Sequence, residues 1–149
     1  NIALKHNVPV VEINKKNFSN ESSWDLEMCQ KVTPFQPELI ILAGFNQLLG
    51  PLFLAQFKGK VMNIHPSLLP HFGGKGMYGN HIHKAVIESK VKKSGITIHW
   101  VSEHYDDGPI IAQKEVLIEN NETVSSLEQK IKLQEKQFYV EIINKILAK

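Results

Sequence analysis

Short apolar runs separated by polar segments predict five strands along the chain. Most of these runs are rich in Val and Ile, and they fall at residues 8–13, 38–43, 60–63, 96–101 and 109–116. The run at 38–43 is apolar almost throughout, which is typical of a strand covered on both faces, as in a parallel sheet. Pro9 places the first strand near an edge of the sheet, because proline cannot donate a hydrogen bond to a neighbouring strand.

Helical patterns lie between these runs. Apolar residues three or four positions apart predict a long helix over 123–147, and shorter helices are expected at 24–32, 51–57 and 83–88. Residues 1–7 are typical of the end of a helix that closes at Asn7, and the glycine-rich residues 71–80 predict a loop. Strands alternating with helices indicate an α/β fold. We expect a single domain over 1–149, with an open, mostly parallel, twisted sheet flanked by helices.

Composition narrows the classes of function. The 149 residues are 42% hydrophobic and 21% charged, which suits a folded domain, and a formal net charge of +2 favours no nucleic-acid partner. The single cysteine, Cys29, cannot form an internal disulfide. The apolar run at 39–45 is far shorter than the roughly 20 residues of a membrane helix. We therefore expect a cytoplasmic protein that binds neither nucleic acid nor membrane.

A candidate catalytic pair stands where the strand at 60–63 ends. Asn63 and His65 are two positions apart, so on an extended backbone their side chains point to the same side. They combine an amide donor with an imidazole that can carry a proton near neutral pH. The plainer alternative is a histidine that only caps backbone carbonyls at the end of the strand.

A candidate acid lies between the last two predicted strands. Asp106-Asp107-Gly108-Pro109 offers adjacent carboxylates at a turn, where Gly108 can adopt a conformation closed to other residues. This sequence is also ordinary turn chemistry and requires no function. If one carboxylate faces His65, it would raise the pKa of the imidazole, which could then donate a proton while Asn63 holds an oxyanion.

Four segments together resemble the folate-dependent formyltransferases: Asn63-Ile-His-Pro-Ser-Leu-Leu-Pro70, the glycine-rich residues 73–79, Gly95-Ile-Thr-Ile-His99 and Asp106-Asp-Gly-Pro-Ile-Ile111. The resemblance covers nearly the whole chain and implies a Rossmann-like formyltransferase fold. It implies transfer of the formyl group of 10-formyltetrahydrofolate to the amine of glycinamide ribonucleotide, the reaction of the purine-pathway members that residues 73–79 most resemble. Both substrates are small molecules, and the resemblance implies a monomer or homodimer with no metal.

The resemblance also implies roles for individual residues. Asn63 would be the oxyanion donor, His65 the general acid and Asp106 the carboxylate that keeps the imidazole protonated. Reduced folate would lie against Asn46, Gln47, Leu48 and Leu49 on one side and Ser102, Glu103, His104 and Tyr105 on the other, next to Asn63 and Asp106. The ribonucleotide would meet Lys132, Leu133, Gln134 and Glu135, with Glu135 contacting the ribose hydroxyls. Lys136 stands where the family usually has histidine.

One family element has no counterpart in residues 1–30. Members begin with a strand and a glycine-rich loop that bind the ribonucleotide phosphate at a helix N-terminus. We therefore expect the sequence to be a fragment lacking this first strand–loop–helix unit. Three alternatives remain: a formyltransferase for another amine, a formyltetrahydrofolate hydrolase, and a noncatalytic remnant that binds folate. His81, His83, His99 and His104 do not have the spacing of zinc ligands, so no metal is expected.

Overall fold

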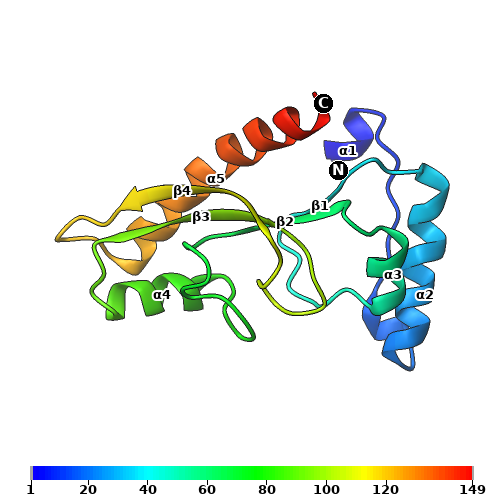
Figure 1. Ribbon diagram of the computed structural model, residues 1–149, viewed down its shortest axis with the longest axis horizontal. Helices are drawn as coiled ribbons and strands as arrows, with labels where there is room; N and C mark the ends of the chain where they lie inside the picture. Colours follow the sequence, from blue (N-terminus) through cyan, green and yellow to red (C-terminus); the bar gives the residue numbers. More distant parts are fainter. Residues whose placement is uncertain (1, 149) are drawn as a thin grey trace.

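A mixed four-stranded sheet with helices packed on it forms the frame of the molecule (Figure 1). The computed structural model describes residues 2–148, so Asn1 and Lys149 lie outside the described residues. The strands are β1 (Ile40–Leu42), β2 (Val61–His65), β3 (Lys93–Trp100) and β4 (Ile110–Leu117). The α-helices are α1 (Ile2–Lys5), α2 (Glu21–Val32), α3 (Pro51–Gln56), α4 (Asn80–Glu88) and α5 (Val124–Leu147), with 3₁₀ turns at Lys15–Asn17 and Thr33–Phe35.

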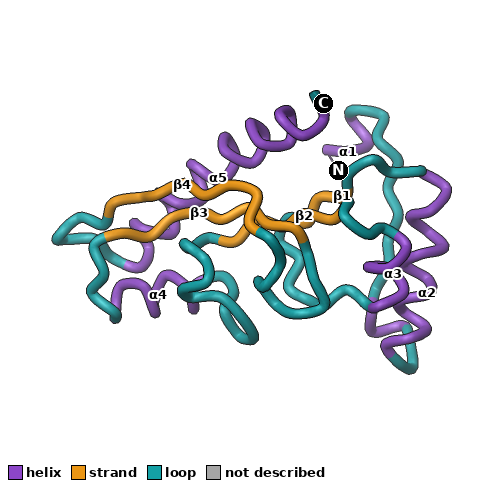
Figure 2. Tube along the Cα trace, viewed as in Figure 1, coloured by secondary structure: helices purple, strands orange, loops and turns teal. Residues whose placement is uncertain are grey.

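The strands are ordered β1-β2-β3-β4 (Figure 2). β1 and β2 are parallel, because α3 lies in the crossover between them, whereas the β2–β3 and β3–β4 pairs are antiparallel. The open α/β sheet is confirmed, but the expectation of mostly parallel pairing is wrong for the described strands. The physical reason is that the chain reverses direction twice, between β2 and β3 through residues 66–92 and between β3 and β4 through residues 101–109, so both pairs are antiparallel.

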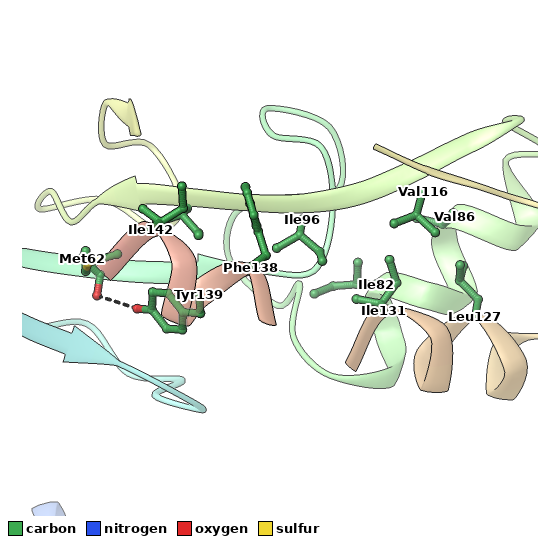
Figure 3. Packing of buried hydrophobic residues seen from close by; sticks show 11 residues of the cluster. Met62, Ile82, Val86, Ile96, Val116, Leu127, Ile131, Phe138, Tyr139 and Ile142 are labelled. Atoms are coloured by element: carbon green, nitrogen blue, oxygen red, sulfur yellow. Dashed lines mark hydrogen bonds between the residues drawn. The ribbon is translucent and has the colours of Figure 1, made fainter. Parts of the chain in front are cut away.

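Two apolar clusters hold these elements together. The larger one lies between the sheet and the helices α4 and α5 (Figure 3), and its buried members are Met62, Ile82, Val86, Ile96, Ile98, Val116, Leu127, Ile131, Phe138, Tyr139 and Ile142. The hydroxyl of Tyr139 donates to the carbonyls of Leu42 (2.9 Å) and Met62 (3.3 Å), which ties α5 to two neighbouring strands. The smaller cluster joins α2 and α3 to β2 through Cys29, Leu49, Phe53, Phe57 and Val61.

The helical predictions are confirmed, with boundaries set by polar caps. α2 begins earlier than expected because the side chain of Asn20 accepts a hydrogen bond from the Ser23 N–H at 2.8 Å. Thr123 caps α5 through the Ser126 N–H, and its backbone N–H in turn donates to the Ser126 hydroxyl. Asn7 adopts the left-handed conformation that was expected after the first helix.

One strand prediction is wrong and a second is wrong in part. Residues 8–13 form no strand, and their valines are exposed, because no described strand lies beside them to complete a ladder. The run at 38–43 yields only the three residues of β1, with Ile41 41% exposed, so it is not covered on both faces. Its apolar pattern is typical of a buried strand, but β1 is an edge of the described sheet.

Candidate active site

Neighbouring strands bring an amide and two imidazoles together. The register of β2 on β3 places Asn63 opposite His99, with Asn63 Nδ2 3.4 Å from His99 Nε2. The Nδ1–H of His99 donates to the Trp100 carbonyl at 2.9 Å, and burial lowers the pKa of His99 despite this bond. The neutral ring therefore carries its proton on Nδ1, and Nε2 accepts from the amide of Asn63. This bond orients Asn63 and leaves its second N–H free to donate elsewhere.

The loop between β3 and β4 brings Asp106 to the same place. Asp106 Oδ1 lies 3.4 Å from His65 Nδ1 and 3.7 Å from His99 Nε2, while Oδ2 accepts from the Gly74 N–H at 3.0 Å. Burial alone would raise the pKa of Asp106, but the bond from His65, the bond from Gly74 and the nearby imidazoles hold it below its ordinary value. The group is therefore an anion at neutral pH.

Both ring nitrogens of His65 face acceptors. Nδ1 faces the Asp106 carboxylate, and Nε2 lies 2.8 Å from the carbonyl of Phe72. A carbonyl and an ionised carboxylate only accept hydrogen bonds, so each ring nitrogen of His65 faces a group to which it can only donate. His65 is 4% exposed. The arrangement suits an acid that gives up a proton after a substrate replaces one of these partners.

Close backbone contact shapes the loop that carries Asp106. A Cβ added at Gly108 would lie 1.6 Å from the Trp100 carbonyl oxygen, so only glycine fits there. Gly108 is not among the glycines with a positive φ, so it is this close contact with the Trp100 carbonyl that closes the position to other residues. Asp106 itself has a φ of 53°, which aspartate tolerates better than most residues.

A hydrogen-bond network holds the segment that follows β2. The Thr97 hydroxyl donates to the carbonyl of Ser67 (2.6 Å) and accepts from the Leu69 N–H (3.0 Å). The Ser67 hydroxyl donates to the His71 carbonyl at 2.7 Å. Ser67 and Thr97 are fully buried, so these bonds are shielded from water. They fix the course of residues 66–71 directly after His65.

A cavity of about 810 Å³ opens on this group. Seven residues of the predicted folate site line it. Asn46, Gln47, Leu48 and Leu49 come from the segment that precedes α3 in the chain, and Ser102, His104 and Tyr105 come from the loop between β3 and β4. Glu103 is exposed and is not among the lining residues. A buried carboxylate of α2, that of Asp25, fixes the start of α3 by accepting from two of its backbone N–H groups.

The predicted ribonucleotide segment of α5 reaches the cavity with one of its faces. Lys132, Glu135 and Lys136 line it, whereas Leu133 is 66% exposed and neither it nor Gln134 lines the cavity. Adjacent positions on a helix face different directions, so four consecutive residues cannot all meet one ligand. Burial raises the pKa of Glu135, against the lowering effect of His65 and Lys132.

Sequence reasoning missed His99 as a member of this site. In the sequence, His99 ends the segment Gly95-Ile-Thr-Ile-His99 that contributes to the resemblance, and it is one of four histidines without zinc-ligand spacing, but no catalytic role is predicted for it. Residues 2–148 contain no group of three or more His, Cys, Asp or Glu side chains that could hold a metal ion. The available signal was the register: a histidine in the strand paired to Asn63 can lie directly opposite it. Within the described residues, no helix is both long and apolar enough to cross a bilayer.

Comparison with known proteins decides the family. The family model described as formyl transferase matches residues 1–143. The chain belongs to the formyl transferase family. It is 36% identical to the phosphoribosylglycinamide formyltransferase of Bacillus subtilis over 95% of its own length and 70% of that protein. A chloroplastic phosphoribosylglycinamide formyltransferase of Vigna unguiculata is 38% identical over 95% of this chain.

Solved structures agree with this membership. The phosphoribosylglycinamide formyltransferase of Bacillus halodurans superposes with a TM-score of 0.90 at 37% identity, covering 99% of this family member and 73% of that chain. The chain spans 45% of the length of the Vigna protein and 50% of its Arabidopsis thaliana counterpart. The formyl transferase fold predicted from the four sequence segments is therefore confirmed.

Proposed function

We propose that residues 1–149 belong to a single catalytic domain, and that the protein transfers the formyl group of 10-formyltetrahydrofolate to the amine of glycinamide ribonucleotide. The observation that supports this proposal most directly is that Asn63, His65 and Asp106 all line one cavity. There His65 Nδ1 lies 3.4 Å from Asp106 Oδ1. The relatives named above support the choice of substrates, since they are phosphoribosylglycinamide formyltransferases.

The reaction follows from the chemistry of these three side chains. The neutral amine of the ribonucleotide attacks the formyl carbon, and a tetrahedral intermediate with an oxyanion forms. The free N–H of Asn63 and a proton of His65 stabilise that oxyanion. The new C–N bond stays, the bond from carbon to N10 of the folate breaks, and N10 gains a proton as the amine loses one. Asp106 stabilises the cationic form of the imidazole from which this proton is donated.

Each substrate has a proposed share of the cavity. Reduced folate contacts Asn46, Gln47, Leu48 and Leu49 on one side and Ser102, His104 and Tyr105 on the other. Glycinamide ribonucleotide contacts Lys132 and Glu135 of α5, which line the cavity, and the Glu135 carboxylate accepts hydrogen bonds from the ribose hydroxyls. Glu103, Leu133 and Gln134 do not line the cavity, and we leave them out of the proposed contacts.

Steady-state kinetics of the full-length protein with both substrates test this proposal. Wild-type protein should form formylglycinamide ribonucleotide, and His65→Ala should lower kcat by about 10²–10⁴. His71→Ala, on an exposed residue after the same strand, is the matched control and should leave kcat unchanged. Release of formate without amine formylation would identify a hydrolase, and transfer only to another amine would identify a sister transferase; either result overturns the proposal.

Calorimetry distinguishes a noncatalytic folate-binding protein. Titrations with a folate analogue and with glycinamide ribonucleotide are carried out separately, and the proposed enzyme binds both. Binding of the folate analogue alone refutes the assigned acceptor. The cytoplasm as compartment, and a monomer or homodimer as the assembly, stay predictions that cell fractionation and light scattering check.

A further inference from the structure

His83 is a buried polar side chain that the reaction described above does not use. It lies on α4, is 2% exposed, and forms part of the cavity wall. Its Nδ1 is buried and has no hydrogen-bond partner within residues 2–148, and no ion pair or hydrogen bond to the ring occurs in that part of the chain. A buried polar group without a partner is unfavourable, so a ligand that supplies the missing bond gains affinity from it.

The surroundings of His83 keep the ring neutral. Burial lowers its pKa, the charge of Glu128 acts in the opposite direction, and Lys132 and His65 lower it further. The ammonium of Lys132 is itself paired with the Glu128 carboxylate at 2.6 Å. A neutral imidazole presents one donor and one acceptor, which matches a hydroxyl group better than a phosphate or an ammonium.

Position relative to the reacting centre points to one substrate. His83 on α4 and Glu135 on α5 both line the cavity, and the charge of His65 acts on both of them. α4 and α5 pack against each other through Ile82, Val86, Leu127 and Ile131, so the two residues line the part of the cavity that these helices form. A ligand whose hydroxyls reach Glu135 there can also reach His83.

We propose that His83 hydrogen-bonds a ribose hydroxyl of the acceptor substrate and contributes to its selection. This inference rests on the proposed function, since it takes glycinamide ribonucleotide as the acceptor. No hydrogen bond within residues 2–148 fixes which edge of the ring faces the cavity, so either nitrogen is available for this contact. His83 is then a specificity-determining residue that touches the substrate without taking part in proton transfer.

Deoxy analogues of the acceptor test this contact with the full-length protein. His83→Phe keeps the ring volume and removes both polar atoms. It should raise the KM for glycinamide ribonucleotide about tenfold and leave the KM for 10-formyltetrahydrofolate and kcat unchanged. Wild-type protein should lose a similar factor with either the 2′-deoxy or the 3′-deoxy analogue, and His83→Phe should lose little more with that analogue. His81→Phe, on an exposed residue of the same helix, is the control that should change neither KM.

Two results would overturn this assignment. One is a His83→Phe variant with an unchanged KM for the ribonucleotide. The other is a His83→Phe variant that loses as large a factor with the deoxy analogue as the wild-type protein does, so that the effects of the variant and the analogue are independent. Circular dichroism establishes that each variant is folded, and His83→Leu replaces His83→Phe if the latter does not fold. Absence of formyl transfer in the wild-type protein would refute the proposed function instead, so the two failures are distinguishable.

Discussion

Replacing Asp25 by alanine should destabilise the protein strongly, because this carboxylate holds the start of α3. It is 2% exposed and accepts hydrogen bonds from the backbone N–H groups of Leu52 (2.8 Å) and Phe53 (3.1 Å). A Cβ at Gly50 would lie 2.0 Å from Asp25 Cγ, so the loop packs directly on the carboxyl group. Asp25→Ala leaves two helix N–H groups without their acceptor.

The size of the effect follows from these contacts. A hydrogen bond to a charged group contributes about 1.5–3 kcal/mol, and the loss of a helix cap costs about 0.5–2 kcal/mol. One carboxylate makes both bonds here, so we expect a loss of about 3 kcal/mol in the free energy of unfolding. For a domain of this length each kcal/mol lowers Tm by about 2–4 °C, which gives a decrease of about 6–12 °C.

Thermal and urea unfolding, followed by circular dichroism, measure this loss. Asn20→Ala is the matched control, because Asn20 caps α2 with one bond of 2.8 Å to the Ser23 N–H at an exposed site. The control should lose about 1 kcal/mol. If Asp25→Ala costs no more than Asn20→Ala, the assignment of a buried, charged cap is wrong. Asp25→Asn keeps one acceptor and should fall between wild type and Asp25→Ala.

Three further predictions concern the site and its loop. Asp106→Asn removes the anion beside the His65 imidazole, so kcat for formyl transfer should fall by about 10²–10⁴ while Tm changes far less. Stopped-time assays measure kcat and calorimetry measures Tm. A normal kcat would contradict the role of Asp106 in supporting His65. Burial lowers the pKa of His99 from 6.5, so below about pH 6.5 the unfolded chain takes up a proton that the folded chain does not, and the free energy of unfolding should fall. Urea unfolding at several pH values should show a smaller pH dependence of this free energy in His99→Gln than in the wild type. An equal pH dependence in the two proteins would refute this cause. Gly108→Ala places a methyl group against the Trp100 carbonyl and should prevent normal folding or lower Tm sharply. In the control Gly44→Ala the new methyl group meets no atom within 4 Å, so only the milder cost of the positive φ is expected. Similar Tm values for both variants would argue against close contact at Gly108.

The local chemistry of the site could be predicted from sequence because it follows strand periodicity. Asn63 and His65 lie two positions apart at the end of a short strand, and the structure has both at the cavity. Asp106 could be chosen over its neighbour only through the resemblance, since a turn with two carboxylates does not say which of them faces inward. The 3.4 Å distance to His65 favours that choice.

The features that could not be predicted from the sequence depend on contacts between distant segments. The role of His99 depends on the register of β3 against β2, and that of Asp25 on α2 packing against α3, neither of which a local pattern contains. The β-branched residues 8–13 have strand propensity but no partner strand among the described residues. Propensity sets what a segment prefers, and pairing decides whether the preference is realised.

The hydrogen bond from the Gly74 N–H to Asp106 has a thermodynamic consequence. Gly74 belongs to the glycine-rich residues 73–79, and its φ of 95° is accessible to few other residues. Displacing this segment withdraws a donor from the carboxylate and makes proton uptake easier. Linkage is reciprocal, so neutralising the acid must loosen the same segment by an equal free energy. The pKa of Asp106 and the position of residues 73–79 are therefore coupled, and measuring a change in one reports the change in the other.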